Sequence, residues 1–198
     1  MQFKVGPWVA PVLASAMLLG AAASAHANLV TNGGFETGDF SGWTLTGNPG
    51  FISITNNAHS GNFAGSFGAV GSDTFLSQTL ATTAGTSYTL TFFLTNLGGP
   101  TNDFSVSFGG QNLTGGGTPA LPILNSGPFP YTEYTVDVTA TGSSSVLQFA
   151  MRQDPSFWNI DDITVDANAA AVPEPATLAI FGTALAGFGL LRRRRKAA

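Results

Sequence analysis

The sequence contains no cysteine, so neither a disulfide nor a thiol can stabilise the fold or take part in a reaction. Charge is also scarce: charged residues make up 9% of the chain, against about 25% in typical soluble domains. Hydrophobic residues still reach 43%, with 16 phenylalanines, which is enough apolar surface for a packed core. We therefore expect the 198 residues to hold one folded domain of ordinary size.

Basic residues are almost absent from the middle of the chain. Between residues 28 and 171 the only Lys or Arg is Arg152, whereas ten acidic residues fall in the same span. The acidic residues are Glu36, Asp39, Asp73, Asp103, Glu133, Asp137, Asp154, Asp161, Asp162 and Asp166. A domain with this surplus of negative charge repels the phosphate backbones of nucleic acids and anionic lipids. Nucleic acid is therefore excluded as a partner.

Residues suited to catalysis are few. His59 is the one imidazole of the main body, and it lies in a turn of small polar residues with no acid beside it, whereas a Ser–His–Asp arrangement needs an acid to orient the ring. The main body has no lysine for Schiff-base chemistry. The adjacent Asp161 and Asp162 are expected on opposite faces of a strand, which disfavours a glycosidase pair. The sequence therefore predicts a protein that is not an enzyme.

The first 27 residues have the pattern of a secretory signal peptide. Lys4 supplies the positive start, residues 9–23 are an apolar run, and residues 25–27 (Ala-His-Ala) match a small-x-small cleavage site. We expect cleavage after Ala27. The alternative is an N-terminal membrane anchor that is not removed.

The C-terminus has three parts. Residues 172–175 read Val-Pro-Glu-Pro, residues 176–191 carry no charge, and residues 192–196 are Arg-Arg-Arg-Arg-Lys. A helix over the apolar part would be about 24 Å long, and arginines reaching to the interface could make up the rest of a hydrocarbon core of about 30 Å. The basic cluster would stay on the cytoplasmic side. We therefore predict a short transmembrane helix that holds the precursor transiently in the inner membrane.

This order of Pro173, Glu174 and Pro175, a short apolar segment and an arginine cluster resembles the PEP-CTERM sorting signal of Gram-negative bacteria. The resemblance implies that an exosortase, a membrane-embedded transpeptidase-like enzyme, removes the tail of residues 169–198. It also implies delivery to the cell envelope, the cell surface or the extracellular matrix, in cells where such sorting accompanies exopolysaccharide production.

Residues 28–168 have the pattern of short strands separated by turns. Apolar and polar residues alternate at 104–108 and 134–138, as in strands with one buried face. Further strand patterns occupy residues 86–95, 146–151 and 160–165. Because no stretch has the period of an amphipathic helix, we predict an all-β fold, an antiparallel β-sandwich of the jelly-roll type. The longest irregular stretch, residues 109–130, is rich in glycine and proline.

Three motifs in this domain carry a second resemblance. They are residues 32–36 (Asn-Gly-Gly-Phe-Glu) followed by Gly42-Trp43, residues 85–92, and residues 158–165. Together they resemble the galactose-binding-like jelly rolls found as carbohydrate-binding modules in cellulases and xylanases. The resemblance implies this fold and a glycan partner, such as the cell's own exopolysaccharide. The alternative is a structural protein of the cell surface or biofilm matrix with no specific glycan ligand.

The same resemblance implies a structural calcium ion. In the resembled modules calcium ties the first and last strands together, which points to Glu36 and Asp161 as ligands, with Asn32 lending an oxygen. Calcium takes about six to eight oxygen ligands, so carboxylates and carbonyls suit it. The alternative is that Glu36 is a solvated charge and that Asp161 and Asp162 cap a turn.

Candidate ligand-binding residues gather between the last two predicted strands. Arg152, Asp154 and Trp158 lie within seven positions, and Tyr131 follows the proline-rich stretch. These side chains could bind a sugar through hydrogen bonds and stacking, or they could equally form an ion pair packed on a ring. We expect Trp43, in contrast, to lie in the core, because a buried indole covers a large apolar area.

Overall fold

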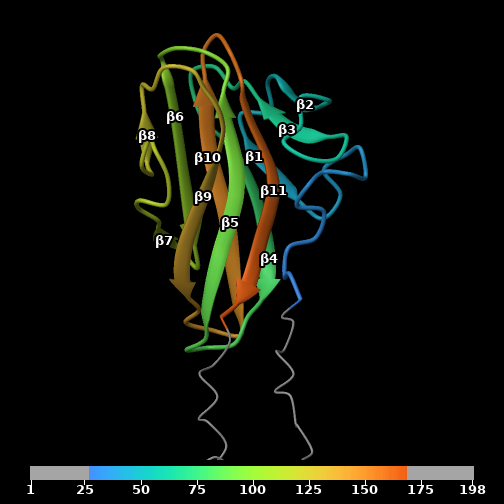
Figure 1. Ribbon diagram of the computed structural model, residues 1–198, viewed down its shortest axis with the longest axis vertical. Coiled ribbons are helices and arrows are strands. Elements are labelled where there is room, and N and C mark those ends of the chain that lie inside the picture. The colour runs from blue at the N-terminus through green and yellow to red at the C-terminus, as the bar shows by residue number, and fades with distance from the viewer. Residues whose placement is uncertain (1–26, 169–198) are drawn as a thin grey trace, which may run out of the picture.

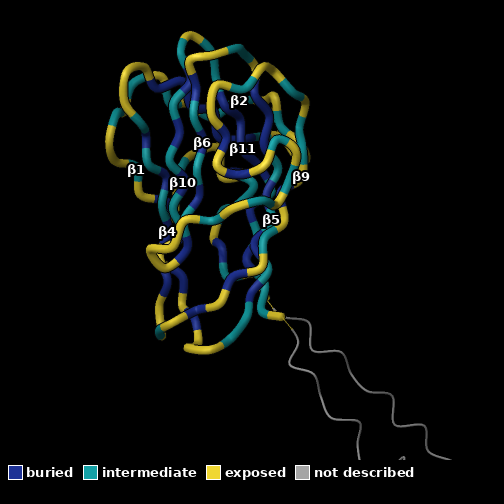
Figure 2. The backbone as a smooth tube through the Cα atoms, turned by 90° about the vertical axis from the view of Figure 1, so that its left-hand side faces the viewer, coloured by how far each residue is buried: buried dark blue, intermediate teal, exposed yellow. Residues whose placement is uncertain are grey.

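A computed structural model describes residues 27–168 of the chain. They form two antiparallel sheets packed face to face, with no helix in this range (Figures 1 and 2). The prediction of an all-β antiparallel sandwich is confirmed. Residues 1–26 of the predicted signal peptide and residues 169–198 of the predicted tail lie outside the described residues. The described part contains no helix long and apolar enough to span a membrane.

The first sheet has the strand order β1-β4-β10-β6-β7, and β8 also pairs with β6. Its strands are β1 (Thr44–Gly47), β4 (Thr74–Ala81), β6 (Asn102–Phe108), β7 (Gln111–Asn112), β8 (Ile123–Leu124) and β10 (Ser144–Gln153). The second sheet has the order β2-β3-β11-β5-β9. Its strands are β2 (Ile52–Thr55), β3 (Ala64–Phe67), β5 (Ser87–Asn96), β9 (Phe129–Thr139) and β11 (Trp158–Ala167).

Alternation of buried and solvent-facing residues explains how the sheets pack. In β6 and β10 every second side chain is buried, and the residues between them face outward. Phe92 of β5 lies at the centre of the core, where its ring stacks on Tyr134 at 5.1 Å and meets Phe149 edge-on at 5.3 Å. The prediction that Trp43 belongs to the core is confirmed, since only 9% of it is exposed. Aromatic contacts between the two sheets therefore dominate the interior.

The segment that resembles an opening strand is a series of turns. Asn32 and Phe35 have φ angles of 53° and 56°, in the left-handed region, and residues 27–43 contain no strand. The segment nevertheless lies against β11, because the Ile163 amide donates to the Gly33 carbonyl at 3.0 Å. A Cβ on Gly33 would lie 2.0 Å from the Ile163 carbonyl oxygen, so this close approach needs glycine.

The stretch of residues 109–130 is irregular but held in place. It contains the two-residue strands β7 and β8, and Gly115 and Leu121 exchange two backbone hydrogen bonds. The Tyr134 hydroxyl donates to the Pro119 carbonyl at 2.9 Å, so the stretch is fastened to β9 of the opposite sheet. Burial raises the pKa of Tyr134 to about 12, which keeps this donor protonated.

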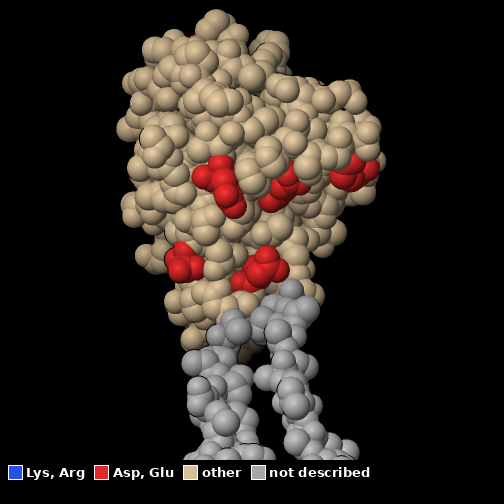
Figure 3. Space-filling model, viewed as in Figure 1, with Lys and Arg blue, Asp and Glu red and all other residues tan. Residues whose placement is uncertain are grey.

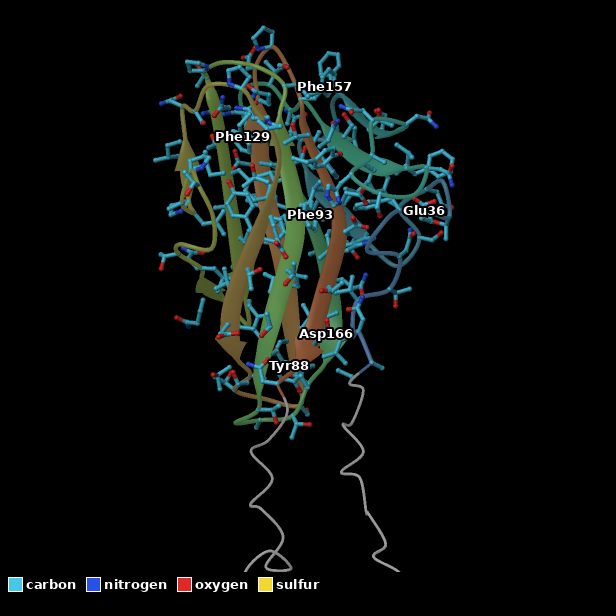
Figure 4. The ribbon with its side chains drawn as sticks, viewed as in Figure 1. Glu36, Tyr88, Phe93, Phe129, Phe157 and Asp166 are labelled. Atoms are coloured by element: carbon cyan, nitrogen blue, oxygen red, sulfur yellow. The ribbon has the colours of Figure 1, made fainter. Side chains whose placement is uncertain are left out.

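The two ends of the described chain meet at one end of the sandwich. The Asn28 side-chain oxygen accepts the Val165 amide at 2.9 Å, and the Asn168 amide donates to the Ser87 carbonyl at 2.9 Å. Figure 4 shows Phe157 at the opposite end, whereas Tyr88 and Asp166 lie near the chain ends. The turn between β10 and β11 is therefore the part of the domain farthest from where the tail begins.

Candidate functional site

The four predicted ligand-binding residues do not form one site. Trp158 is completely buried, and its ring lies 5.6 Å from the Phe104 ring and 6.0 Å from the Phe129 ring. Its indole N–H donates to the Arg152 carbonyl at 2.8 Å. Trp158 consequently has no exposed ring face on which a sugar could stack. Its ring is instead packed inside the fold, as in the alternative to a sugar site.

Arg152 points away from Trp158 on the outer face of the first sheet. Its guanidinium contacts the same oxygen of Asp103, with Nη2 at 2.8 Å and Nε at 3.0 Å. Burial and the charge of Asp73 raise the pKa of Asp103, while Arg152 opposes them. The ion pair with Asp154, which was the alternative to a sugar site, is absent among the described residues, where Asp154 instead exchanges backbone hydrogen bonds with Thr101.

Tyr131 lies on the outer face of the second sheet, beside the loop that joins β2 to β3. Its hydroxyl donates to the Asn57 carbonyl at 2.7 Å, and burial raises its pKa. The neighbouring His59 ring stacks on Phe93 at 3.6 Å, and its Nδ1 lies 2.7 Å from a carboxylate oxygen of Asp162. Tyr131 and His59 therefore hold this loop against the sheet. No local pattern could reveal the acid beside His59, because Asp162 is 103 residues away in the chain.

The proposed metal ligands Glu36 and Asp161 accept hydrogen bonds from the same loop. Glu36 Oε1 accepts the amides of residues 62 and 63 at 2.8 and 3.0 Å. Asp161 Oδ2 accepts the amides of residues 59 and 60 at 2.8 and 3.1 Å. The side-chain amide of Asn32 donates to the carbonyls of Asp39 and Ser41. The two carboxylates thus fasten opposite ends of a five-residue turn.

The environments of these two carboxyl groups differ. The backbone hydrogen bonds from Phe63 and Asn62 lower the pKa of Glu36, which is exposed to water. Burial raises the pKa of Asp161, although the amide hydrogen bonds that it accepts oppose that shift. Asp161 therefore belongs to the small class of fully buried carboxyl groups that need hydrogen-bond donors around them.

Asp161 and Asp162 lie on the same side of β11, so the expectation of opposite faces was wrong. A β-bulge between Asp161 and Thr164, with Asp162 at a φ of 50°, breaks the alternation of the strand. A Cβ on Gly34 would meet Oδ1 of each aspartate at 3.6 Å and Cγ of Glu36 at 3.7 Å. Three acidic side chains therefore surround Gly34. No group of three or more Asp, Glu or His in residues 27–168 has metal-binding geometry.

A pocket at the end farthest from Asn28 and Asn168 was not predicted. We call it the distal pocket; its volume is about 220 Å³. It is lined by Phe51, Gly68, Val70, Pro155, Ser156 and Phe157. The three segments that form it are far apart in the sequence, and Phe51 lies in a turn, where no alternation marks a residue as buried or exposed. No local pattern could have revealed the pocket.

Charge is distributed unevenly over the domain surface. Figure 3 looks onto the second sheet, where several acidic residues are spread over the face and no Lys or Arg is visible. Glu133 and Asp137 project from β9 and Asp166 from β11. In contrast, none of the six residues that line the distal pocket is charged.

Comparison with known proteins identifies the C-terminus. Residues 171–195 match the PEP-CTERM protein-sorting motif, which marks an exported protein whose membrane-anchored precursor is sorted to the cell surface and implies processing by an exosortase. A search of the curated proteins finds no matching sequence.

Solved structures share the fold of the described domain. The module TmCBM61, solved in complex with β-1,4-galactotriose, aligns with a TM-score of 0.54 and 23% identity over 72% of this chain and 99% of the module. The CBM22-1 xylan-binding domain of Xyn10C from Paenibacillus barcinonensis aligns with a TM-score of 0.51 and 17% identity over 76% of this chain and 100% of that domain. A cyclase from Fischerella sp. TAU aligns with a TM-score of 0.50 and 18% identity over 72% of this chain and 98% of the cyclase chain. The fold therefore also occurs in an enzyme. The chain therefore joins a PEP-CTERM sorting motif to a β-sandwich domain with the fold of carbohydrate-binding modules.

Proposed function

We propose that this protein is exported, displayed at the cell surface or in the extracellular matrix, and binds a neutral glycan without catalysing a reaction. The observation that carries the proposal is the combination in one chain of the sorting motif at residues 171–195 with the fold of carbohydrate-binding modules. Sorting of this kind brings the domain to the place where the cell's exopolysaccharide is found. An exopolysaccharide is therefore the partner that we propose.

The charge of the domain supports a neutral glycan. Arg152 is the only Lys or Arg between residues 28 and 171, and it is paired with Asp103. No free cation of the described domain is left to bind a uronate or sulfate group, and the acidic face of the second sheet repels such groups. Galactan and xylan fragments are suitable first probes, because modules of this fold were solved with galactotriose or are named for xylan.

A glycan array with the protein purified from the surface of the producing cell tests this proposal. We expect binding of one or more neutral oligosaccharides and none of polyuronates at the same concentration. Isothermal titration calorimetry with β-1,4-galactotriose and soluble xylan fragments would then give the affinity. Absence of binding to every neutral glycan at about 1 mM would reject the proposal.

A structural role in the matrix is the second candidate. It is favoured by the burial of Trp158, since that removes the one tryptophan expected to stack on a sugar. A protein of this kind would reach the surface in the same way and would contribute bulk, spacing or self-association. It predicts no binding on the array and a change in matrix architecture when the gene is deleted.

We also propose that calcium binds beside Gly34. Glu36, Asp161 and Asp162, whose side chains lie around Gly34, would hold it after a rearrangement, because carboxylates are the ligands that calcium prefers but the three do not have metal-binding geometry as they stand. Calcium would supply no chemistry other than a positive charge that ties the N-terminal turns to β11. Glu36 and Asp161 each accept two backbone amides on one oxygen. Some of these hydrogen bonds would have to break for the same oxygens to bind the ion.

A further inference from the structure

We propose that the distal pocket binds the apolar face of one sugar ring of a neutral glycan, with Phe51 and Phe157 as the stacking side chains. This inference rests on the proposed carbohydrate binding and assigns a site to it. The predicted cluster around Trp158 cannot be that site, because Trp158 is buried.

The size and lining of the pocket suit a single ring. Residue 51 precedes β2, residues 68–70 follow β3, and residues 155–157 join β10 to β11, so three separate segments form the walls. A volume of about 220 Å³ is below the range of about 300–1,000 Å³ that is usual for drug-sized ligands. Ser156 has the one polar side chain among the lining residues.

Phe51 combines an exposed side chain with a strained backbone. Its side chain is 67% exposed, and its φ is 58°, a left-handed conformation that is an outlier for a bulky residue. The Gly68 amide donates to the Phe51 carbonyl at 3.0 Å and so holds the residue at the pocket rim. Strained residues of this kind cluster at ligand sites. An exposed ring in a strained position therefore indicates a recognition residue.

Phe157 is fixed before any ligand arrives. A Cβ on Gly68 would lie 2.7 Å from the Phe157 ring, and a Cβ on Gly98 would lie 2.3 Å from the Ser156 Cβ. Glycine at both positions lets the 155–157 turn lie directly on the neighbouring backbone, and the Leu97 amide donates to the Phe157 carbonyl at 3.1 Å. Preorganisation of this kind reduces the ordering cost of binding.

The position and charge of the pocket determine what can occupy it. Tyr88 and Asp166 lie near the ends of the described chain at one end of the domain, and Phe157 lies at the other (Figure 4), so the pocket is remote from the point where the tail leaves the domain. The lining carries no charge, whereas the side of the domain seen in Figure 3 is acidic. An uncharged extracellular molecule with a flat apolar face meets both conditions, and the C–H face of a sugar ring is such a surface.

Calorimetry with a Phe51→Ala variant tests the site, using the mature protein purified from the producing cell and the probes β-1,4-galactotriose and soluble xylan fragments. We expect the affinity to fall about tenfold or more, by analogy with the loss of an aromatic that stacks on a nucleic-acid base. Phe51→Tyr should retain the affinity, and Phe157→Ala should reduce it. The matched control is Leu124→Ala, since Leu124 is equally exposed, at 69%, but lies on β8. That control should bind as the unmodified protein does.

A Phe51→Gly variant distinguishes a direct loss of glycan binding from a loss of affinity caused by impaired folding. Glycine adopts the left-handed conformation freely, so the melting temperature should not fall, whereas the affinity should fall as in Phe51→Ala. Glycan binding that is unchanged in both Phe51→Ala and Phe157→Ala would overturn the site and leave the proposed function standing. Absence of glycan binding by the unmodified protein would overturn both. If the unmodified protein sediments as a dimer that Phe51→Ala dissociates, with unchanged glycan affinity, the site is overturned and the pocket is instead a contact between copies of this chain.

Discussion

At the scale of single residues, Trp158 shows how one side chain supports both sheets. It belongs to β11 of the second sheet, yet its ring contacts Phe104 of the first and its N–H donates to the Arg152 carbonyl. Trp158→Ala should therefore lower the free energy of unfolding by about 3–5 kcal/mol. Urea unfolding measures this loss. A variant within about 0.5 kcal/mol of the unmodified protein would contradict the buried position.

The ion pair of Arg152 and Asp103 predicts a pH-dependent loss of stability. Both side chains are partly exposed, so Arg152→Ala should cost about 1–2 kcal/mol at neutral pH, between the values for surface and buried pairs. Without the cation the pKa of Asp103 rises further above its ordinary 3.8. A carboxyl group with a raised pKa favours folding below its unfolded pKa and loses that contribution as pH rises through its folded pKa.

Urea unfolding at pH 4 and pH 7 checks this prediction. The difference between Arg152→Ala and the unmodified protein should be larger at pH 7, where Asp103 would be ionised without a partner. Arg152→Lys is the matched variant, since it keeps the charge and should recover part of the loss. A difference that is equal at both pH values would show that Asp103 does not depend on the arginine.

At the scale of elements, the loop between β2 and β3 is held by carboxylates from both ends of the domain sequence. Glu36 accepts amides near its end, whereas Asp161 and Asp162 accept donors near its middle. These are the side chains that the calcium proposal uses. Any change in their protonation or metal content should affect this loop first, because its amides and the Ser60 hydroxyl donate the hydrogen bonds that these carboxylates accept.

If calcium binds there, it should stabilise the folded protein by about 2.7 kcal/mol at a hundredfold excess over the Kd. Chelation at constant ionic strength should then lower the melting temperature, as followed by calorimetry. Asp161→Asn should abolish the difference between calcium and chelator. Asp137→Asn is the control, since Asp137 lies on β9, outside the proposed site, and accepts a hydrogen bond from the Thr89 hydroxyl. Identical melting with calcium and with chelator would reject the proposal.

Some elements could be predicted from the sequence and others could not. The cores of β5, β6, β9, β10 and β11 follow from alternating or apolar runs, because each strand buries one face or is central in its sheet. In β3 all four residues are buried, so no alternation marks it. The bulge that turns Asp161 and Asp162 to the same side depends on how residues 28–36 pack on β11, which is contact across more than 100 positions.

The candidate site was predicted less well than the fold. Proximity in sequence suggested that Arg152, Asp154 and Trp158 would meet, but Arg152 lies on β10 of the first sheet, whereas Trp158 lies on β11 of the second. Arg152 faces outward, while β11 directs Trp158 into the core. The distal pocket, in contrast, forms where three turns meet, and only the folded chain brings them together.

At the scale of the whole molecule, both ends of the described residues lie at the same end of the sandwich, so we expect both processing events there. The mature protein should begin at Asn28, whose side chain accepts the amides of Val30 and Val165. It should also lack the basic cluster of residues 192–196, because the sorting motif at 171–195 directs removal of the tail. Intact-mass spectrometry of the protein from the producing cell checks both ends. Extracellular protein that retains residues 192–196 would contradict the sorting proposal.

The course of β11 has a mechanical consequence. This strand begins at Trp158, directly after the distal pocket, and ends at Ala167, directly before the tail. It lies inside its sheet between β3 and β5. A glycan that pulls on the pocket of an anchored precursor would therefore load β11 along its length, with β2 and β3 sharing the force because residues 51 and 68 also line the pocket. Because the hydrogen bonds of an antiparallel pair run across the strands, they would have to break together rather than one by one. The domain is thus arranged to stay folded under a pull between its ligand and its anchor.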